Sequence, residues 1–125
     1  MKVVIEGELT DLNKFINAQR ANRFGGAKVK KDNTQKCAMA FAPIKAKKLK
    51  LPITLHIMWY CKDKRKDPDN IAFGQKFILD GMQECGLLEN DGFNQVKALH
   101  HSFEIDKENP RIEVLIEEMN INESN

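Results

Sequence analysis

Hydrophobic and polar residues alternate along four segments of the chain, which is the spacing of a strand with one buried face. These segments are residues 2–9, 52–60, 96–105 and 111–118. The alternation is clearest in the second segment, whose hydrophobic side chains share one face: Ile53, Leu55, Ile57 and Trp59. We therefore predict four strands, with the last two separated by a turn at Asn109-Pro110.

Three further segments are predicted to form helices. The first begins at the N-cap candidates Thr10 and Asp11 and ends near Gly25. The second runs from about residue 27 to residue 42, where Pro43 interrupts it. The third runs from residue 70 to residue 85 and stops at Gly86, with a hydrophobic stripe made of Phe73, Phe77, Ile78 and Met82.

Length and composition fit one domain with one core. The chain has 125 residues, of which 42% are hydrophobic, and neither a repeat nor a long linker divides it. We expect a single α+β domain over residues 1–119, with a mixed or antiparallel sheet and helices packed on it. A polar tail is expected at residues 120–125.

The chain also lacks the usual marks of export. Its first ten residues, MKVVIEGELT, have acids where a signal peptide needs an apolar run, and no segment approaches the roughly 18 apolar residues of a membrane span. Cys37, Cys61 and Cys85 form no CxxC pair, so free thiols in a reducing compartment are the simplest interpretation. We expect a cytoplasmic protein without a membrane partner.

Charge is divided unevenly along the chain, although the net charge is only +2. Residues 1–66 contain 16 Lys and Arg and 5 Asp and Glu, whereas residues 67–125 contain 4 and 13, which gives net charges of +11 and −9. Such a division is typical of a protein that binds a phosphate-rich partner on its basic side. The alternative is a pair of oppositely charged faces that keep the protein soluble or attract each other in a dimer.

Asp67 and Asp69 follow directly after the basic segment 62–66. Pro68 favours extended backbone before it, on which residues two apart point to the same side. Carboxylates this close repel one another unless a positive charge lies between them, and hard cations such as Mg²⁺ prefer oxygen ligands. Together with the later Asp91 they predict a metal site beside a phosphate-binding surface. The simpler alternative is solvated charge in a loop.

Lys76 and Asp80 lie four positions apart on the third predicted helix, so their side chains can meet. The spacing alone favours an ordinary surface ion pair, and the functional alternative makes Lys76 a phosphate or transition-state contact. Asp91 begins an Asp-Gly pair, which is also a common turn.

These residues resemble a known family in their order along the chain, over about residues 65–97. The motifs in question are Asp67-x-Asp69-Asn70, then Lys76-x-x-x-Asp80-Gly81, then Asn90-Asp91 and Gln95-Val96. They are similar to those of the RusA family of Holliday junction resolvases, in particular to RusA-like proteins of phages and prophages of Gram-positive bacteria. The chain departs from the family's pattern at two places. The segment between Asp69 and Lys76 is about three residues longer here, and Asn90-Asp91 occupies the place of a pair of acids.

The resemblance implies a small homodimeric endonuclease that uses Mg²⁺, or Mn²⁺, to cut four-way DNA junctions symmetrically in recombination and repair. It assigns metal binding to Asp67, Asp69 and Asp91, and the role of the essential lysine to Lys76. Asn70 and Asp80 match supporting positions. The basic residues expected to hold the DNA arms are Arg20, Arg23, Lys28, Lys30, Lys31, Lys62, Lys64, Arg65 and Lys66.

Two other functions stay open on the sequence. One is a DNA-binding module without catalysis, in which the acids only stabilise turns. The other is a nuclease that acts on flaps or other branched DNA.

Overall fold

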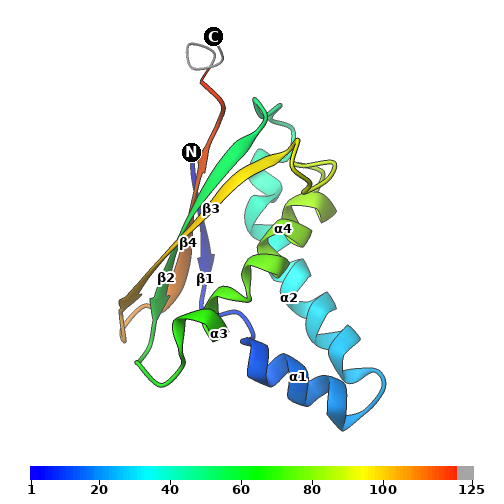
Figure 1. Cartoon of the computed structure of the whole chain (residues 1–125), viewed down its shortest axis with the longest axis vertical. Helices are drawn as coiled ribbons and strands as arrows, with labels where there is room; N and C mark the ends of the chain where they lie inside the picture. The colour runs from blue at the N-terminus through cyan, green and yellow to red at the C-terminus, as the bar shows by residue number, and fades with distance from the viewer. Residues whose placement is uncertain (121–125) are drawn as a thin grey trace.

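The computed structural model describes residues 1–120, in which a four-stranded sheet has the order β1-β4-β2-β3 (Figure 1). The strands are β1 Lys2–Glu6, β2 Ile53–Cys61, β3 Val96–Ile105 and β4 Arg111–Glu117. β2 and β3 are parallel, whereas β4 is antiparallel to both β1 and β2. The sheet is therefore mixed, and the α+β class predicted from the sequence is confirmed.

The helices all lie on the same side of this sheet (Figure 1). They are α1 Leu12–Ala21, α2 Gly25–Phe41, the short 3₁₀ helix η1 Ala42–Ile44, α3 Pro68–Ala72 and α4 Gln75–Glu84. α3 and α4 form the crossover between the parallel strands β2 and β3, as a parallel pair requires.

The core lies between the sheet and the long helices α2 and α4. The five odd-numbered residues of β2, from Ile53 to Cys61, are all buried there, as their two-residue spacing predicts. Phe41 of α2 and Phe77 of α4 meet them with no exposed surface. α2 and α4 approach closely at Gly81, where an added Cβ would lie 2.5 Å from Cβ of Cys37.

The predicted elements differ from the structure mainly at their ends. β1 stops at Glu6 rather than residue 9, because Gly7 turns the chain with a φ of 79°. The first helix ends at Ala21 because Asn22 is extended, and α2 then starts at Gly25 rather than residue 27. The predicted strand 96–105 matches β3. Of the predicted tail, residues 121–125 lie outside the described part.

The single helix predicted at residues 70–85 is wrong, since the structure has α3 and α4 in its place. The break falls at Phe73 and Gly74, where the chain packs against Trp59. A Cβ on Gly74 would lie 2.9 Å from the Trp59 ring, so this close approach needs glycine. Hydrophobic spacing could not reveal the break, because Ile71 and Phe73 before it pack against the same core as the buried residues of α4.

Within residues 1–120, no helix is both long and apolar enough to cross a membrane.

Candidate functional site

Asp67 and Asp69 lie at the start of α3, just after the basic loop 62–66 that leaves β2. Asp67 is extended, with φ −75° and ψ 150°, and occupies the N-cap position, although its side chain makes no capping hydrogen bond. Asp69 is in the first helical turn, so the predicted extended backbone across both acids is wrong beyond Asp67. Pro68 begins the helix because its fixed φ suits the first helical position. Both acids are exposed.

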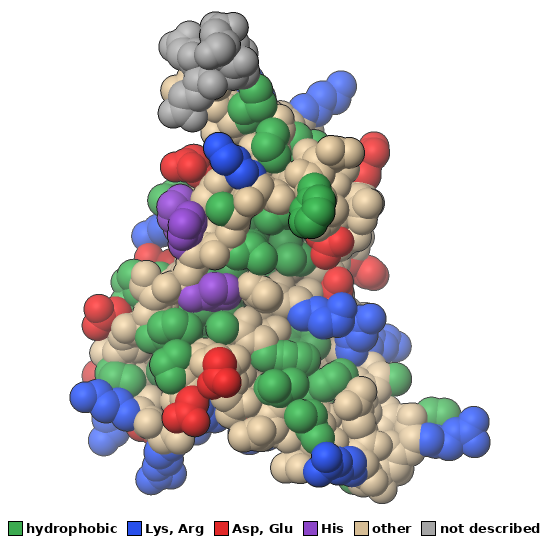
Figure 2. All heavy atoms as spheres, in the orientation of Figure 1, with side chains coloured by type: hydrophobic (Ala, Val, Ile, Leu, Met, Phe, Trp, Pro, Cys, Tyr) green, Lys and Arg blue, Asp and Glu red, His purple; other side chains and the backbone are tan. Residues whose placement is uncertain are grey.

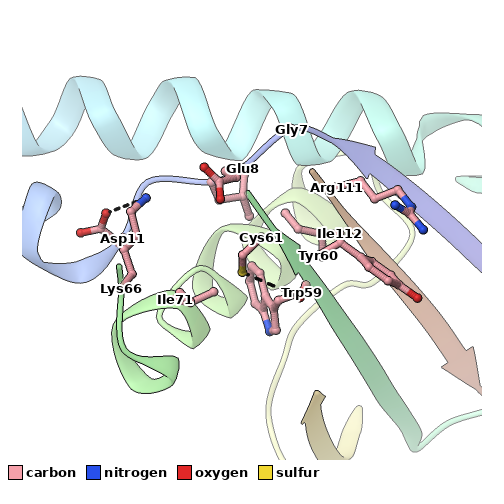
Figure 3. Close-up of a pocket in the computed structure, with 11 residues that line it drawn as sticks. Gly7, Glu8, Asp11, Trp59, Tyr60, Cys61, Lys66, Ile71, Arg111 and Ile112 are labelled. Atoms are coloured by element: carbon pink, nitrogen blue, oxygen red, sulfur yellow. Dashed lines mark hydrogen bonds and ion pairs between the residues drawn. The ribbon is translucent and has the colours of Figure 1, made fainter. Parts of the chain in front are cut away.

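Two contacts from α1 hold this segment in place. Lys66 Nζ lies 3.1 Å from Asp11 Oδ2, an ion pair marked in Figure 3. Asn13 donates its backbone N–H to Asn70 Oδ1 at 2.9 Å. Asp11 also caps α1 by accepting from the Lys14 backbone N–H at 2.9 Å. Asn70 therefore helps to dock α3 onto α1.

Asp11 is buried and ionised in this arrangement. Burial opposes its charge, but the Lys14 N–H and the Lys66 ammonium outweigh burial and lower the pKa of Asp11 below 3.8. The cavity beside it, between residues 7–11 and 59–61, is only about 20 Å³ (Figure 3). A space of this size suits a single water rather than a substrate.

An aromatic cluster fixes α1, α3 and α4 to one another. The Phe15 ring centroid lies 5.2 Å from that of Phe73 and 6.3 Å from that of Phe77, and Phe73 and Phe77 meet edge to face at 5.5 Å. Such pairs add to the stabilisation from burial alone. The acidic segment is therefore mounted on a rigid support rather than on a free loop.

A hydrogen-bonded chain joins β2, β3 and the start of α4. Trp59 Nε1 donates to His101 Nδ1 at 2.9 Å, and His101 Nε2 lies 2.8 Å from Gln75 Oε1. Because the indole N–H can only donate, Nδ1 must be the acceptor and the proton of the neutral ring must be on Nε2. Burial, and to a lesser extent His100, lowers the pKa of His101 and favours this neutral form.

Lys76 follows Gln75 on α4 and forms the ion pair expected from its spacing. Its Nζ lies 3.7 Å from Asp80 Oδ2, and about half of the lysine side chain is exposed. Asp80 Oδ2 is buried and accepts no hydrogen bond. Asp80 thus lies next to Lys76 but can engage only one N–H of its ammonium. The ammonium keeps two or more donors for another partner.

A hollow of about 350 Å³ opens beside Asp67. Its walls come from the loop after β2, from α3 and from the end of β3. The apolar lining consists of Cys61, Pro68, Ile71, Phe103 and Ile105, and the charged lining of Asp63, Lys64, Lys66, Asp67 and Glu104. The volume lies near the lower end of the roughly 300–1,000 Å³ typical of ligand sites.

Asp91 lies at the opposite end of the parallel strands. It is exposed in the connection between α4 and β3, four residues before Gln95, whose carbonyl accepts from the Ile53 N–H at 2.8 Å. Asp67, by contrast, shares its hollow with Ile105, at the far end of β3. β2 has 9 residues and β3 has 10, so about 27 Å of strand separates the two ends.

The predicted three-acid metal site is therefore not assembled within one chain. Asp67 and Asp69 are neighbours at one end of the sheet, and Asp91 is at the other (Figure 1). Among residues 1–120, no group of three or more His, Cys, Asp or Glu side chains is placed to hold a metal ion.

Basic side chains gather toward the end of the molecule that carries Asp67 and Asp69. Figure 2 shows Lys and Arg side chains along the lower part of one face, with acidic side chains between them. The predicted DNA-binding residues are exposed in α1, the following turn, the first half of α2 and the basic loop, except for the half-buried Lys66. Arg65 pairs loosely with Asp63, at 3.7 Å.

Sequence reasoning missed the residues that support the site. Asp11 was recognised as a helix cap, but no pattern linked it to Lys66, 55 positions away in the sequence. His101 and Gln75 carry no motif, and only the packing of β3 against α4 brings them together. The buried thiols of Cys37 and Cys61 are poor nucleophiles, because burial raises the pKa of Cys61 and raises that of Cys37 to about 12.

No protein-family model and no curated protein sequence matches this chain.

Proposed function

We propose that this protein is a metal-dependent endonuclease that cuts branched DNA, with four-way junctions as its substrate. The observation that carries the proposal is the placement of Asp67 and Asp69: both are exposed next to the basic loop, on a segment fixed to α1 at two points, and Asp67 lines the hollow. The order of motifs that resembles the RusA family supports the same reaction.

Phosphate binding would come from the basic loop and from α1 and α2. The basic loop, α1 and the start of α2 lie toward the end that holds the two acids (Figure 1), and their Lys and Arg side chains are exposed, so a bound DNA backbone would be brought to the acids. Lys66 would contribute less than its neighbours, since Asp11 already holds its ammonium at 3.1 Å.

The acids present in one chain make an incomplete cation site. Asp67 and Asp69 would supply two carboxylates, and Asp91 would join them only from a second copy of the chain. A divalent cation bound there would act as a Lewis acid toward the scissile phosphate and a water molecule.

Lys76 would interact with the negative charge that develops on the phosphate. Its side chain is about half exposed, and its ammonium lies 3.7 Å from Asp80 Oδ2, a distance too long for a strong hydrogen bond. Lys76→Ala should therefore reduce single-turnover cleavage more than it reduces junction affinity. Lys97→Ala is the matched control, because Lys97 is an exposed lysine near the other end of β3.

Cleavage of synthetic DNA tests the proposal directly. Purified protein with Mg²⁺ or Mn²⁺ should nick a four-way junction faster than linear, flap or Y-shaped DNA, and EDTA should stop it. Full activity in chelator would exclude the metal mechanism. Faster cutting of flaps would support the nuclease activity but make flaps, rather than four-way junctions, its substrate.

A DNA-binding module without catalysis is the second candidate, favoured by the separation of Asp91 from the other acids within one chain. It predicts junction binding without cleavage in any divalent cation. For either function, replacing Lys64 and Arg65 with Gln tests how much these two residues contribute to DNA affinity. Each lost phosphate contact should reduce the slope of log K against log salt by about 0.9.

A further inference from the structure

Four lysines lie close together outside the basic surface near Asp67, in the segment that joins η1 to β2. This segment, residues 45–50, reads KAKKLK. Its lysines are all exposed: Lys45, Lys47, Lys48 and Lys50. No Asp or Glu occurs in the sequence between Asp32 and Asp63. A run of basic residues is often only a solvated surface, so the setting of this one in the fold decides what it can bind.

These lysines have no acidic partner. Within residues 1–120, none of their side chains forms an ion pair or a hydrogen bond, whereas Lys66 pairs with Asp11 at 3.1 Å. Two acids follow one another where β4 ends, beside the segment. Glu117 Oε1 lies 3.6 Å from His56 Nε2, and Glu118 Oε1 is buried. The four lysine charges are therefore left to a partner from outside the chain.

The backbone of the segment is held in place. The Lys47 N–H donates to the Ile44 carbonyl at 3.0 Å, and the Lys50 carbonyl accepts from the Met119 N–H at 3.0 Å. Ile44 and Leu49 also pack against the core. A partner would have to order only the lysine side chains, which lowers the entropic cost of binding.

The segment lies about one strand length from the two acids of the candidate site. Figure 1 shows residues 45–50 at the end of the molecule opposite α3. β2 begins three residues after Lys50, and its 9 residues extend about 27 Å to the basic loop before Asp67.

Helix α2 joins the two ends on the other side of the core. It leads from α1 to the segment, is about 25 Å long, and carries exposed Lys28 and Lys31 on the way. A duplex that follows α2 from the acids would reach the segment after about 8 base pairs, at about 3.4 Å each.

We propose that residues 45–50 form a second phosphate-binding surface, which holds a duplex arm of the DNA about 8 base pairs from the phosphate that lies at Asp67 and Asp69. The choice of DNA as the polyanion rests on the proposed function. The surface itself rests on four exposed, unpaired lysines on a fixed backbone. Lysines that contact only phosphates carry no sequence information, so this surface would select for arm length and not for sequence.

Four-way junctions with short and long arms test this surface without any cleavage. Hairpin-closed arms of about 6 base pairs end before the segment, and arms of about 16 base pairs extend past it. In EDTA, Lys47→Gln combined with Lys48→Gln should weaken binding of the long-armed junction roughly tenfold and change that of the short-armed junction by less than about twofold. An unchanged affinity for the long arms, or an equal loss on both junctions, would overturn the inference.

A matched variant removes the same charge beside the acids. Lys64→Gln combined with Arg65→Gln should weaken both junctions alike, because these residues belong to the basic loop. The slope of log K against log salt then separates direct contact from attraction at a distance. The Lys47 and Lys48 replacements should reduce this slope by about 0.9 for each lost phosphate contact, on long arms alone. An unchanged slope would contradict direct contact.

Amide NMR signals locate the contact on the full chain. Signals of residues 45–50 should shift with the long-armed junction and stay in place with the short-armed one. Vesicles of equal parts phosphatidylserine and phosphatidylcholine test the other common polyanion. A response to these vesicles and to neither junction would assign the lysines to a membrane surface and overturn the inference.

The outcomes for this surface and for the proposed nuclease are distinguishable. If the wild type cuts no DNA but the variants show the expected dependence on arm length, the second surface stands and the nuclease fails. If the wild type cuts junctions with Mg²⁺ but the Lys47 and Lys48 replacements leave binding of long arms unchanged, the nuclease stands and the second surface fails.

Discussion

The two ends of the β2–β3 pair carry the same kind of side chain in opposite settings. At one end, Asp67 and Asp69 are mounted on α3, which α1 holds through the Asp11–Lys66 ion pair and the Asn13–Asn70 hydrogen bond. At the other end, Asp91 is exposed in a turn beside the fully exposed Phe93.

The difference shows what a folded chain provides before any partner arrives. The end with two acids has the supports, the hollow and the basic loop of a prepared site. The end with Asp91 has the features of a projecting contact: high exposure, acidic charge and one aromatic residue. Five predictions test this contrast between a prepared end and a projecting end.

The largest effect should come from removing a charge at the prepared end. Asp69→Asn keeps the size of the side chain and should lower cleavage roughly a thousandfold, because a lost carboxylate weakens the cation site. Junction binding should persist or tighten, since repulsion between the site and phosphate falls. Single-turnover cleavage and gel-shift affinity measure the two quantities, and unchanged turnover would remove Asp69 from the site.

Matched glycine substitutions compare how tightly the two ends are packed. Gly74→Ala should lower the free energy of unfolding by about 1–3 kcal/mol, because its Cβ would lie 2.9 Å from the Trp59 ring. Gly92→Ala, in the turn with Asp91, meets nothing nearer than Gln95 Oε1 at 3.4 Å and should be nearly neutral. Urea unfolding of both variants measures the contrast, and equal losses would contradict it.

Matched aspartate substitutions compare how much a carboxylate at each end contributes to the free energy of unfolding. Asp11→Ala removes a helix cap and the partner of Lys66, so it should cost about 1–2 kcal/mol of stability. Asp91→Ala should change stability by less than about 0.5 kcal/mol, as expected for an exposed turn.

The stability that Asp11 provides should also depend on pH. Since folding lowers its pKa, the ionised form stabilises the fold above the ordinary value of 3.8, and this is lost as pH falls through the lowered pKa. The stability difference between wild type and Asp11→Ala should therefore shrink in acid. A difference that stays constant from pH 7 to pH 3 would show that the carboxylate charge contributes nothing.

The smallest effect concerns His101, which ties the start of α4 to Trp59. Folding lowers its pKa below 6.5, so the unfolded chain takes up the proton first as pH falls and the native state loses stability. His101→Gln keeps a hydrogen-bonding side chain that does not titrate. Its melting temperature should fall less between pH 7.5 and pH 5.5 than that of wild type.

Local patterns along the chain were enough to predict most of the fold. Alternation located β2, β3 and β4 to within one residue, because each strand buries one face and its partners do not change that spacing. Gly86 ended α4 with a φ of 90°, as a glycine after a helix is expected to do. The break between α3 and α4 was missed because it depends on contact with Trp59, a residue of another element.

The candidate site was likewise predictable only in part from the sequence. The types and order of Asp67, Asp69, Lys76 and Asp91 are properties of the sequence and indicated a reaction. Their positions in space are set by β2 and β3, whose length of about 27 Å places Asp91 at one end and the other acids at the opposite end. Spacing along a chain limits only how far apart two residues can be. Whether they meet depends on packing between elements.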